Sequence, residues 1–106
     1  SKGPLIPMGA HFTYLPRSQE DKERCHSLGA KVLDGIFQGY GQKVGGYPTE
    51  ELIIVDWKQL DEADHLSQVT HKRFHWDEVR VVKTGDSFNF PLADGDLNQP
   101  GLRVDQ

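Results

Sequence analysis

The sequence has a single cysteine, Cys25, among 106 residues. It therefore cannot form an internal disulfide, which excludes a small secreted scaffold stapled by disulfides. Long apolar runs are missing as well, since the longest is Leu52–Val55 and a membrane-spanning helix needs about twenty apolar residues. No basic segment followed by an apolar one opens the chain, as it would in a secretory signal. These absences predict an intracellular, soluble domain without a membrane partner.

Basic residues are also few, because 12 Lys and Arg face 16 Asp and Glu and the formal net charge is -4. A freely basic nucleic-acid binder has the opposite balance, since phosphate contacts depend on Lys and Arg. The length suits one domain. We expect one β-rich domain over residues 1–93 and a mobile tail over residues 94–106, where Asp, Gly, Asn and Pro leave little to bury.

What the chain does contain is short stretches of alternating apolar and polar residues between Gly and Pro. Period-two alternation predicts strands, here over residues 8–15, 32–40, 51–57, 69–82 and 87–92. The fourth stretch is one strand or two with a bend at Asp77–Glu78. Within it Phe74 and Trp76 are expected on one face, with His71, Arg73 and His75 on the other.

The predicted fold class is mainly β, a small bent sheet or an SH3-like barrel of about five strands with at most short helical turns. Residues 17–28 are dense in charge of both signs and lack an apolar stripe. They predict a surface loop or one helical turn, with Ser18 as a candidate N-cap. Residues 58–66 could hold another helical turn.

Glycine is concentrated in one stretch, since six of the eleven glycines lie between Gly29 and Tyr47. A phosphate cradle would need a G-x-G-x-x-G or P-loop spacing that leads into a helix, and a strand is predicted to follow instead. Glycines inside a strand mark a bulge or a close backbone approach, and those at 41–48 predict a turn with Gly45–Gly46 at its tip. The residues with a predicted structural role are Gly29, Gly35, Ile36, Phe37, Gly39 and Tyr40.

The spacing of the histidines and the cysteine does not match that of known catalytic or metal sites. His71 and His75 are four apart, but a zinc signature needs a second pair of ligands and the chain has no CxxC or HExxH. Cys25 and His26 are adjacent, so in an extended segment their side chains point apart rather than forming a nucleophile and its base. We therefore predict no catalytic residue, no metal and no cofactor, with a zinc-dependent hydrolase as a minor alternative.

One segment is locally basic and carries aromatic residues between its charges. Such a mixture can stack on bases and contact phosphates, or it can be an ordinary strand with one buried and one solvated face. The candidate contact residues for nucleic acid or a partner are His71, Lys72, Arg73, Arg80 and Lys83.

The stretch GAKVLDGIFQGY, Gly29–Tyr40, resembles the segment that follows the integrase catalytic core in copia-type retrotransposon polyproteins. The block Gly-Ile-Phe-x-Gly-Tyr that begins at Gly35 is its most specific part. Residues 7–12, 45–57 and 69–78 are similar to the family's lead-in, glycine turn and following strands in the same order.

The resemblance implies a non-enzymatic accessory domain, SH3-like by analogy, that contacts DNA or another integrase subunit. The catalytic carboxylates of such an integrase lie upstream of this region. The net charge of -4 favours protein contacts over duplex binding. The alternative is a free-standing β-rich domain from mobile DNA that forms a homodimer and binds a small ligand or a protein.

Overall fold

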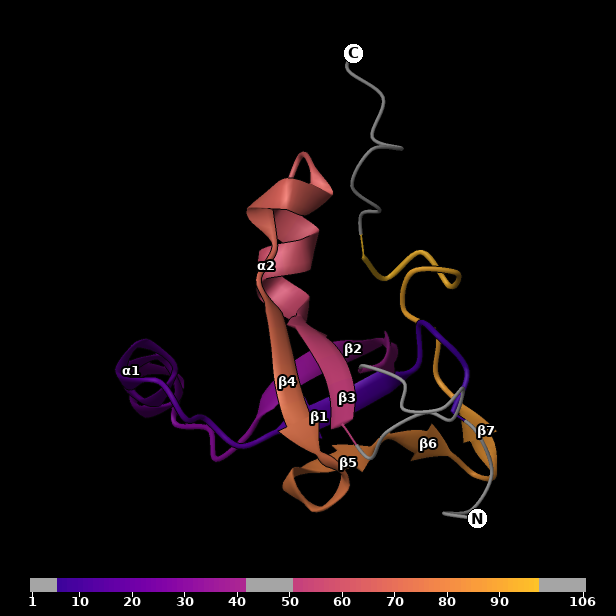
Figure 1. Cartoon of the computed structure of the whole chain (residues 1–106), viewed down its shortest axis with the longest axis horizontal. Helices are drawn as coiled ribbons and strands as arrows, with labels where there is room; N and C mark the ends of the chain where they lie inside the picture. The colour runs from indigo at the N-terminus through magenta and orange to yellow at the C-terminus, as the bar shows by residue number, and fades with distance from the viewer. Residues whose placement is uncertain (1–5, 42–50, 98–106) are drawn as a thin grey trace.

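The computed structural model describes residues 6–41 and 51–97, and within these ranges the chain is mainly β (Figure 1). None of the helices in these ranges is long and apolar enough to cross a membrane. The described elements, in chain order, are β1 (His11–Tyr14), α1 (Gln19–Leu28), β2 (Leu33–Tyr40), β3 (Glu51–Asp56), α2 (Trp57–Glu62), the 3-10 helix η1 (Leu66–Gln68), β4 (His71–His75), the 3-10 helix η2 (Trp76–Glu78), β5 (Val79–Val81), β6 (Lys83–Thr84) and β7 (Ser87–Phe88).

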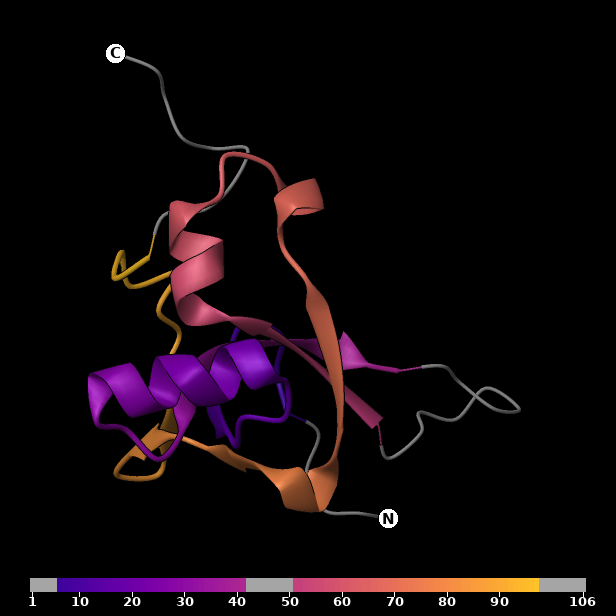
Figure 2. The ribbon, with the colours of Figure 1, turned by 90° about the vertical axis from the view of Figure 1, so that its left-hand side faces the viewer.

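Five strands form one antiparallel sheet in the order β4-β3-β2-β1-β5, and β6 pairs with β7 separately. The two edge strands, β4 and β5, are consecutive in sequence and are joined only by the three residues of η2. So short a link between opposite edges requires a strongly bent sheet, which Figures 1 and 2 show. Among the described residues β4 and β5 are not paired. Of the two predicted forms, a bent sheet and an SH3-like barrel, the described residues thus form the bent sheet.

The predicted strand at 69–82 is two strands, with η2 at the expected bend. Phe74 points into the core and is 2% exposed, as its alternation predicts. The prediction that Trp76 shares this face is wrong, because the pleat ends at His75 and Trp76 begins η2 with 43% of its surface exposed.

Apolar side chains pack on both faces of the sheet. One core contains Phe12 and Phe37, whose ring centroids lie 5.7 Å apart. The other contains Ile36 and Val55 and extends to Leu97, which is 6% exposed. Within the predicted tail at 94–106, residues 94–96 are exposed and Leu97 is packed against the domain, while residues 98–106 lie outside the described residues.

The charge-dense segment forms a ten-residue helix, α1, where a loop or a single turn was predicted. Its ends follow local rules, because the Ser18 side chain accepts a hydrogen bond from the N–H of Asp21, as predicted for an N-cap, and Gly29 closes the helix at φ +66°. Asp21 and Cys25 are its buried residues.

Two strand glycines have the roles that were predicted for them. A Cβ on Gly35 would lie 2.4 Å from Ile54 Cγ2, so this position requires close approach of β3. The β2–β3 register shifts between Phe37 and Gly39, and Gly39 has φ +128°, which indicates a bulge. The predicted turn with Gly45–Gly46 at its tip lies outside the described residues.

Candidate contact surface on strand β4

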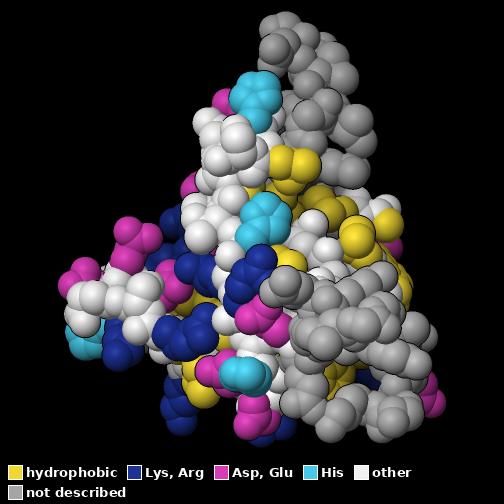
Figure 3. Space-filling view, in the orientation of Figure 1, with side chains coloured by type: hydrophobic (Ala, Val, Ile, Leu, Met, Phe, Trp, Pro, Cys, Tyr) yellow, Lys and Arg dark blue, Asp and Glu magenta, His cyan; other side chains and the backbone are white. Residues whose placement is uncertain are grey.

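The alternation of β4 separates its charged residues onto two faces. His71, Arg73 and His75 are exposed on one face, and Arg73 Nη1 lies 2.7 Å from Glu51 Oε1 on the neighbouring strand β3. Figure 3 shows basic, acidic and histidine side chains intermixed on this side of the molecule. The exposed face of β4 therefore combines cations with nearby carboxylates rather than forming a uniformly basic patch.

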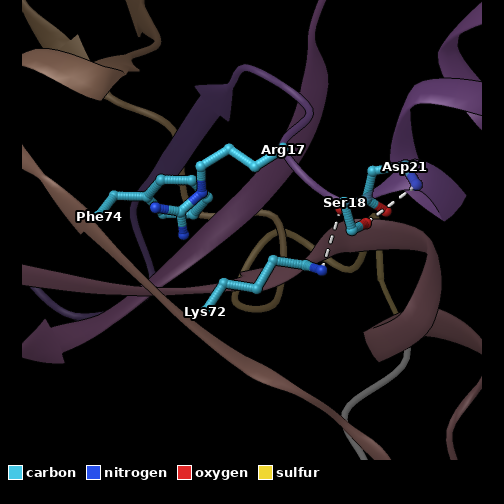
Figure 4. A pocket seen from close by; sticks show the side chains of 5 residues that line it. All are labelled: Arg17, Ser18, Asp21, Lys72 and Phe74. Carbon is cyan, nitrogen blue, oxygen red and sulfur yellow. Dashed lines mark hydrogen bonds and ion pairs between the residues drawn. The ribbon is translucent and has the colours of Figure 1, made fainter.

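The opposite face of β4 meets α1 around a cavity of about 160 Å³. Lys72 Nζ lies 3.0 Å from Asp21 Oδ2, and the Arg17 guanidinium lies 4.1 Å from the centre of the Phe74 ring. Figure 4 shows Arg17 stacked over Phe74 while Lys72 extends toward Asp21, with Ser18 beside them. The cavity thus has an aromatic wall, two cations and one carboxylate.

The outer edge of β4 is covered by two side chains. Arg17 Nη2 donates to the backbone carbonyl of Arg73 at 2.6 Å, and Glu78 Oε1 accepts from the backbone N–H of His75 at 2.7 Å. The two side chains also form an ion pair, with Arg17 Nη1 3.7 Å from Glu78 Oε2. Arg17 and Glu78, which we call the edge cover, thus form hydrogen bonds with backbone groups of β4 that face away from the sheet.

A second charged cluster attaches α1 to the sheet. The Asp56 carboxylate accepts hydrogen bonds from Arg24 at 2.9 Å and from the Tyr14 hydroxyl at 2.7 Å. It also accepts from the N–H of Gln59 and thereby caps α2. Burial and the Asp56 hydrogen bond raise the pKa of Tyr14, so its hydroxyl stays protonated and donating.

The remaining predicted contact residues lie away from the exposed face of β4. Arg80 is exposed on β5, the opposite edge strand, where it pairs in register with Thr13 of β1. Lys83 in β6 places its ammonium 4.8 Å from the centre of the Phe88 ring. Of the five predicted residues, the structure therefore brings only His71 and Arg73 onto a common exposed face.

Sequence reasoning missed Arg17, Asp21 and Glu78. Arg17 is 56 residues from the Arg73 carbonyl that it covers, and Asp21 is 51 residues from Lys72, so no local pattern links them. Glu78 had a local signal, because a carboxylate three residues after the residue that precedes a helix is typical of a capping pair.

The chain matches no family model and no solved structure. Among curated proteins it is similar to the catabolic ornithine carbamoyltransferase of Clostridium perfringens strain 13 and to the ornithine carbamoyltransferase of strain SM101. Each is 33% identical over 94 residues, and each alignment covers 76% of this chain and 28% of the relative. The chain thus spans just over a quarter of the length of these relatives.

Proposed function

We propose that this chain is a non-catalytic accessory domain that binds another protein through strand β4. The resemblance of Gly29–Tyr40 to the region after a copia-type integrase core makes an integrase subunit the proposed partner. The observation that carries the proposal is β4 itself, an edge strand with His71, Arg73 and His75 exposed, whose outer backbone hydrogen-bonds to the side chains of Arg17 and Glu78 and to no other strand within residues 6–41 and 51–97. The bent five-stranded sheet is consistent with the architecture that the resemblance implies.

Protein contact has better support than DNA contact because two of the predicted phosphate-binding cations already have carboxylate partners. Lys72 pairs with Asp21, which is buried, and Arg73 pairs with Glu51. A phosphate would have to compete with these carboxylates on a chain whose net charge is -4. A protein surface can supply its own anions together with shape and backbone hydrogen bonds, so it depends less on free cations.

The test is a calorimetric titration of the chain with a purified copia-type integrase catalytic core, in parallel with labelled single- and double-stranded DNA. The core is expected to bind. Arg73→Glu should weaken this binding by about tenfold or more, because it reverses a contact charge, whereas Arg80→Glu on the opposite edge should leave it unchanged. DNA should bind weakly and be released at about 0.2 M salt. Tight DNA binding without binding to the core would overturn the proposal.

Binding of a small zwitterion is a second candidate, favoured by the cavity between α1 and β4. Arg17 lines the cavity and offers a cation to a ligand carboxylate. A ligand ammonium group would bind Asp21 by taking the place of Lys72 Nζ, which lies 3.0 Å from Asp21 Oδ2. The probe is ornithine, an amino acid that carries both a carboxylate and ammonium groups. It appears in the names of the carbamoyltransferase relatives. Saturable heat of binding that Asp21→Asn removes would support this candidate, and an absence of heat would reject it.

A further inference from the structure

We propose that the outer edge of β4 accepts an extended acidic segment of the partner protein as an added strand, and that the edge cover protects this edge until the segment binds. The proposal rests on the proposed function, because it specifies how the protein contact is made. Addition of a strand to a sheet edge gains main-chain hydrogen bonds, and alternate side chains then provide specificity.

The register of the sheet shows which backbone groups are offered. The N–H of Gly41 donates to the carbonyl of Glu51 at 2.7 Å, so the backbone of Glu51 faces β2. Because antiparallel residues alternate, Leu52 and Ile54 then face β4 and pair with Phe74 and Lys72. The backbone groups of the other three residues of β4 point away from the sheet, and these residues are His71, Arg73 and His75.

The edge cover can be displaced without unfolding the domain. The Arg17 side chain is 51% exposed and that of Glu78 is 35% exposed, and such pairs near the surface contribute little to stability. Charged side chains over an edge strand are a common protection against unwanted strand pairing. The cover is therefore suited to keeping the edge closed to weak partners while yielding to a segment that supplies better hydrogen bonds.

The charges beside the edge select an acidic segment. Arg73 projects on the exposed face between His71 and His75, and Arg17, which stacks on Phe74 of the other face, reaches the backbone carbonyl of Arg73 at the strand edge. Glu51 and Glu78 already place carboxylates against Arg73 and Arg17. An incoming strand with carboxylates at alternate positions can take over these contacts, so the domain's own glutamates occupy the places proposed for the partner's carboxylates.

A second copy of the chain is a poorer occupant than an acidic segment. Antiparallel pairing of two β4 strands centred on Arg73 would place Arg73 opposite Arg73 and His71 opposite His75. Parallel pairing in register would likewise set each residue beside its own copy. Two Arg73 guanidinium groups directly opposite each other destabilise a strand pair, so the edge disfavours its own copy and favours a segment that places a carboxylate opposite Arg73.

The experiment uses a labelled, end-blocked peptide of about six residues, an ordinary strand length, in which Glu and Val alternate. Binding is followed by fluorescence anisotropy, and the bound edge is located by hydrogen exchange of backbone amides. The peptide is expected to bind and to slow exchange at the amides of His71 and Arg73. Glu78→Ala should tighten binding about two- to fivefold by freeing Arg17, whereas the matched change Glu62→Ala on α2 should have no effect.

Two control peptides test the parts of the proposal separately. A peptide with Lys in place of Glu should not bind, and a Glu–Val peptide methylated at alternate backbone nitrogens should bind at least about tenfold more weakly, because it cannot complete the strand. Equal binding of either control would overturn the inference. Dimers that show the same amide protection without peptide would also overturn it, in favour of a second copy.

The two proposals can fail separately. If the integrase core binds but the amides of His71 and Arg73 exchange as in the free chain, strand addition is wrong and the proposed function stands. If neither the core nor the peptide binds and DNA does, both are wrong.

Discussion

Asp56 joins three elements at a single carboxylate. It accepts hydrogen bonds from Tyr14 of β1, from Arg24 of α1 and from the N–H of Gln59 in α2. Burial by itself would raise the pKa of Asp56, but these hydrogen bonds and the charge of Arg24 outweigh burial and lower it. The ionised form is therefore favoured by folding, and Asp56 stabilises the fold only while it carries its charge.

Asp56→Asn is expected to lower the free energy of unfolding by about 3 kcal/mol, because Arg24 loses its countercharge and α2 loses a charged cap. This loss of unfolding free energy should reach its full size above the ordinary Asp pKa of about 4. It should shrink as the pH falls through the lowered pKa of Asp56, because the original chain then loses the charge as well. Urea unfolding at several pH values measures it. The control is Asp34→Asn, whose side chain is 58% exposed and paired with His11, and a loss as large as that of Asp56→Asn would contradict this role.

At the scale of elements, the strands of the five-stranded sheet were predictable, whereas α1 and β6 were not and the strand predicted over residues 87–92 ends at Phe88. Period-two alternation is local, so β2, β3 and β4 could be placed from sequence together with the exposed and buried faces of β4. Helix α1 lacks an apolar stripe and is attached to the sheet by Asp21–Lys72 and Arg24–Asp56, which link residues 51 and 32 positions apart. Charge pairs at such separations leave no periodic signal in a single sequence.

Because ion pairs attach α1 to the sheet, removal of one of them should loosen the helix. Lys72→Gln should lower the free energy of unfolding by about 2 kcal/mol, because Asp21 stays buried without a full countercharge. Amides of α1 should then exchange faster than those of β2 and β3, which hydrogen exchange measures residue by residue.

The double variant Asp21→Asn with Lys72→Gln should recover part of the loss, since it removes both charges together. Lys58→Gln, an exposed change of the same kind on α2, serves as the control. If Lys72→Gln leaves the exchange of α1 unchanged, the ion pair does not hold the helix.

At the scale of the whole molecule, the fold closes both faces of its sheet with segments that are distant in sequence. Phe88 and Phe90 pack against the core that contains Phe12, while Leu97 packs against the core that contains Ile36. The composition after Ala93 hides this second contact, because Leu97 stands alone between Asp96 and Asn98 in a polar stretch. The edge cover was hidden as well, since Arg17 contacts a backbone carbonyl that is 56 residues away in sequence.

Leu97 allows a direct test of whether the segment after Ala93 belongs to the domain. Leu97→Ala is expected to lower the free energy of unfolding by about 2 kcal/mol, because it removes buried apolar surface beside Ile36 and leaves a cavity. Leu66→Ala makes the same change at a side chain that is 57% exposed and should cost under about 0.5 kcal/mol. Urea unfolding of both variants measures the difference. If both variants lower the free energy of unfolding equally, the packing of Leu97 does not stabilise the domain. A larger loss for Leu97→Ala makes Leu97 part of the core that contains Ile36 of β2 and Val55 of β3.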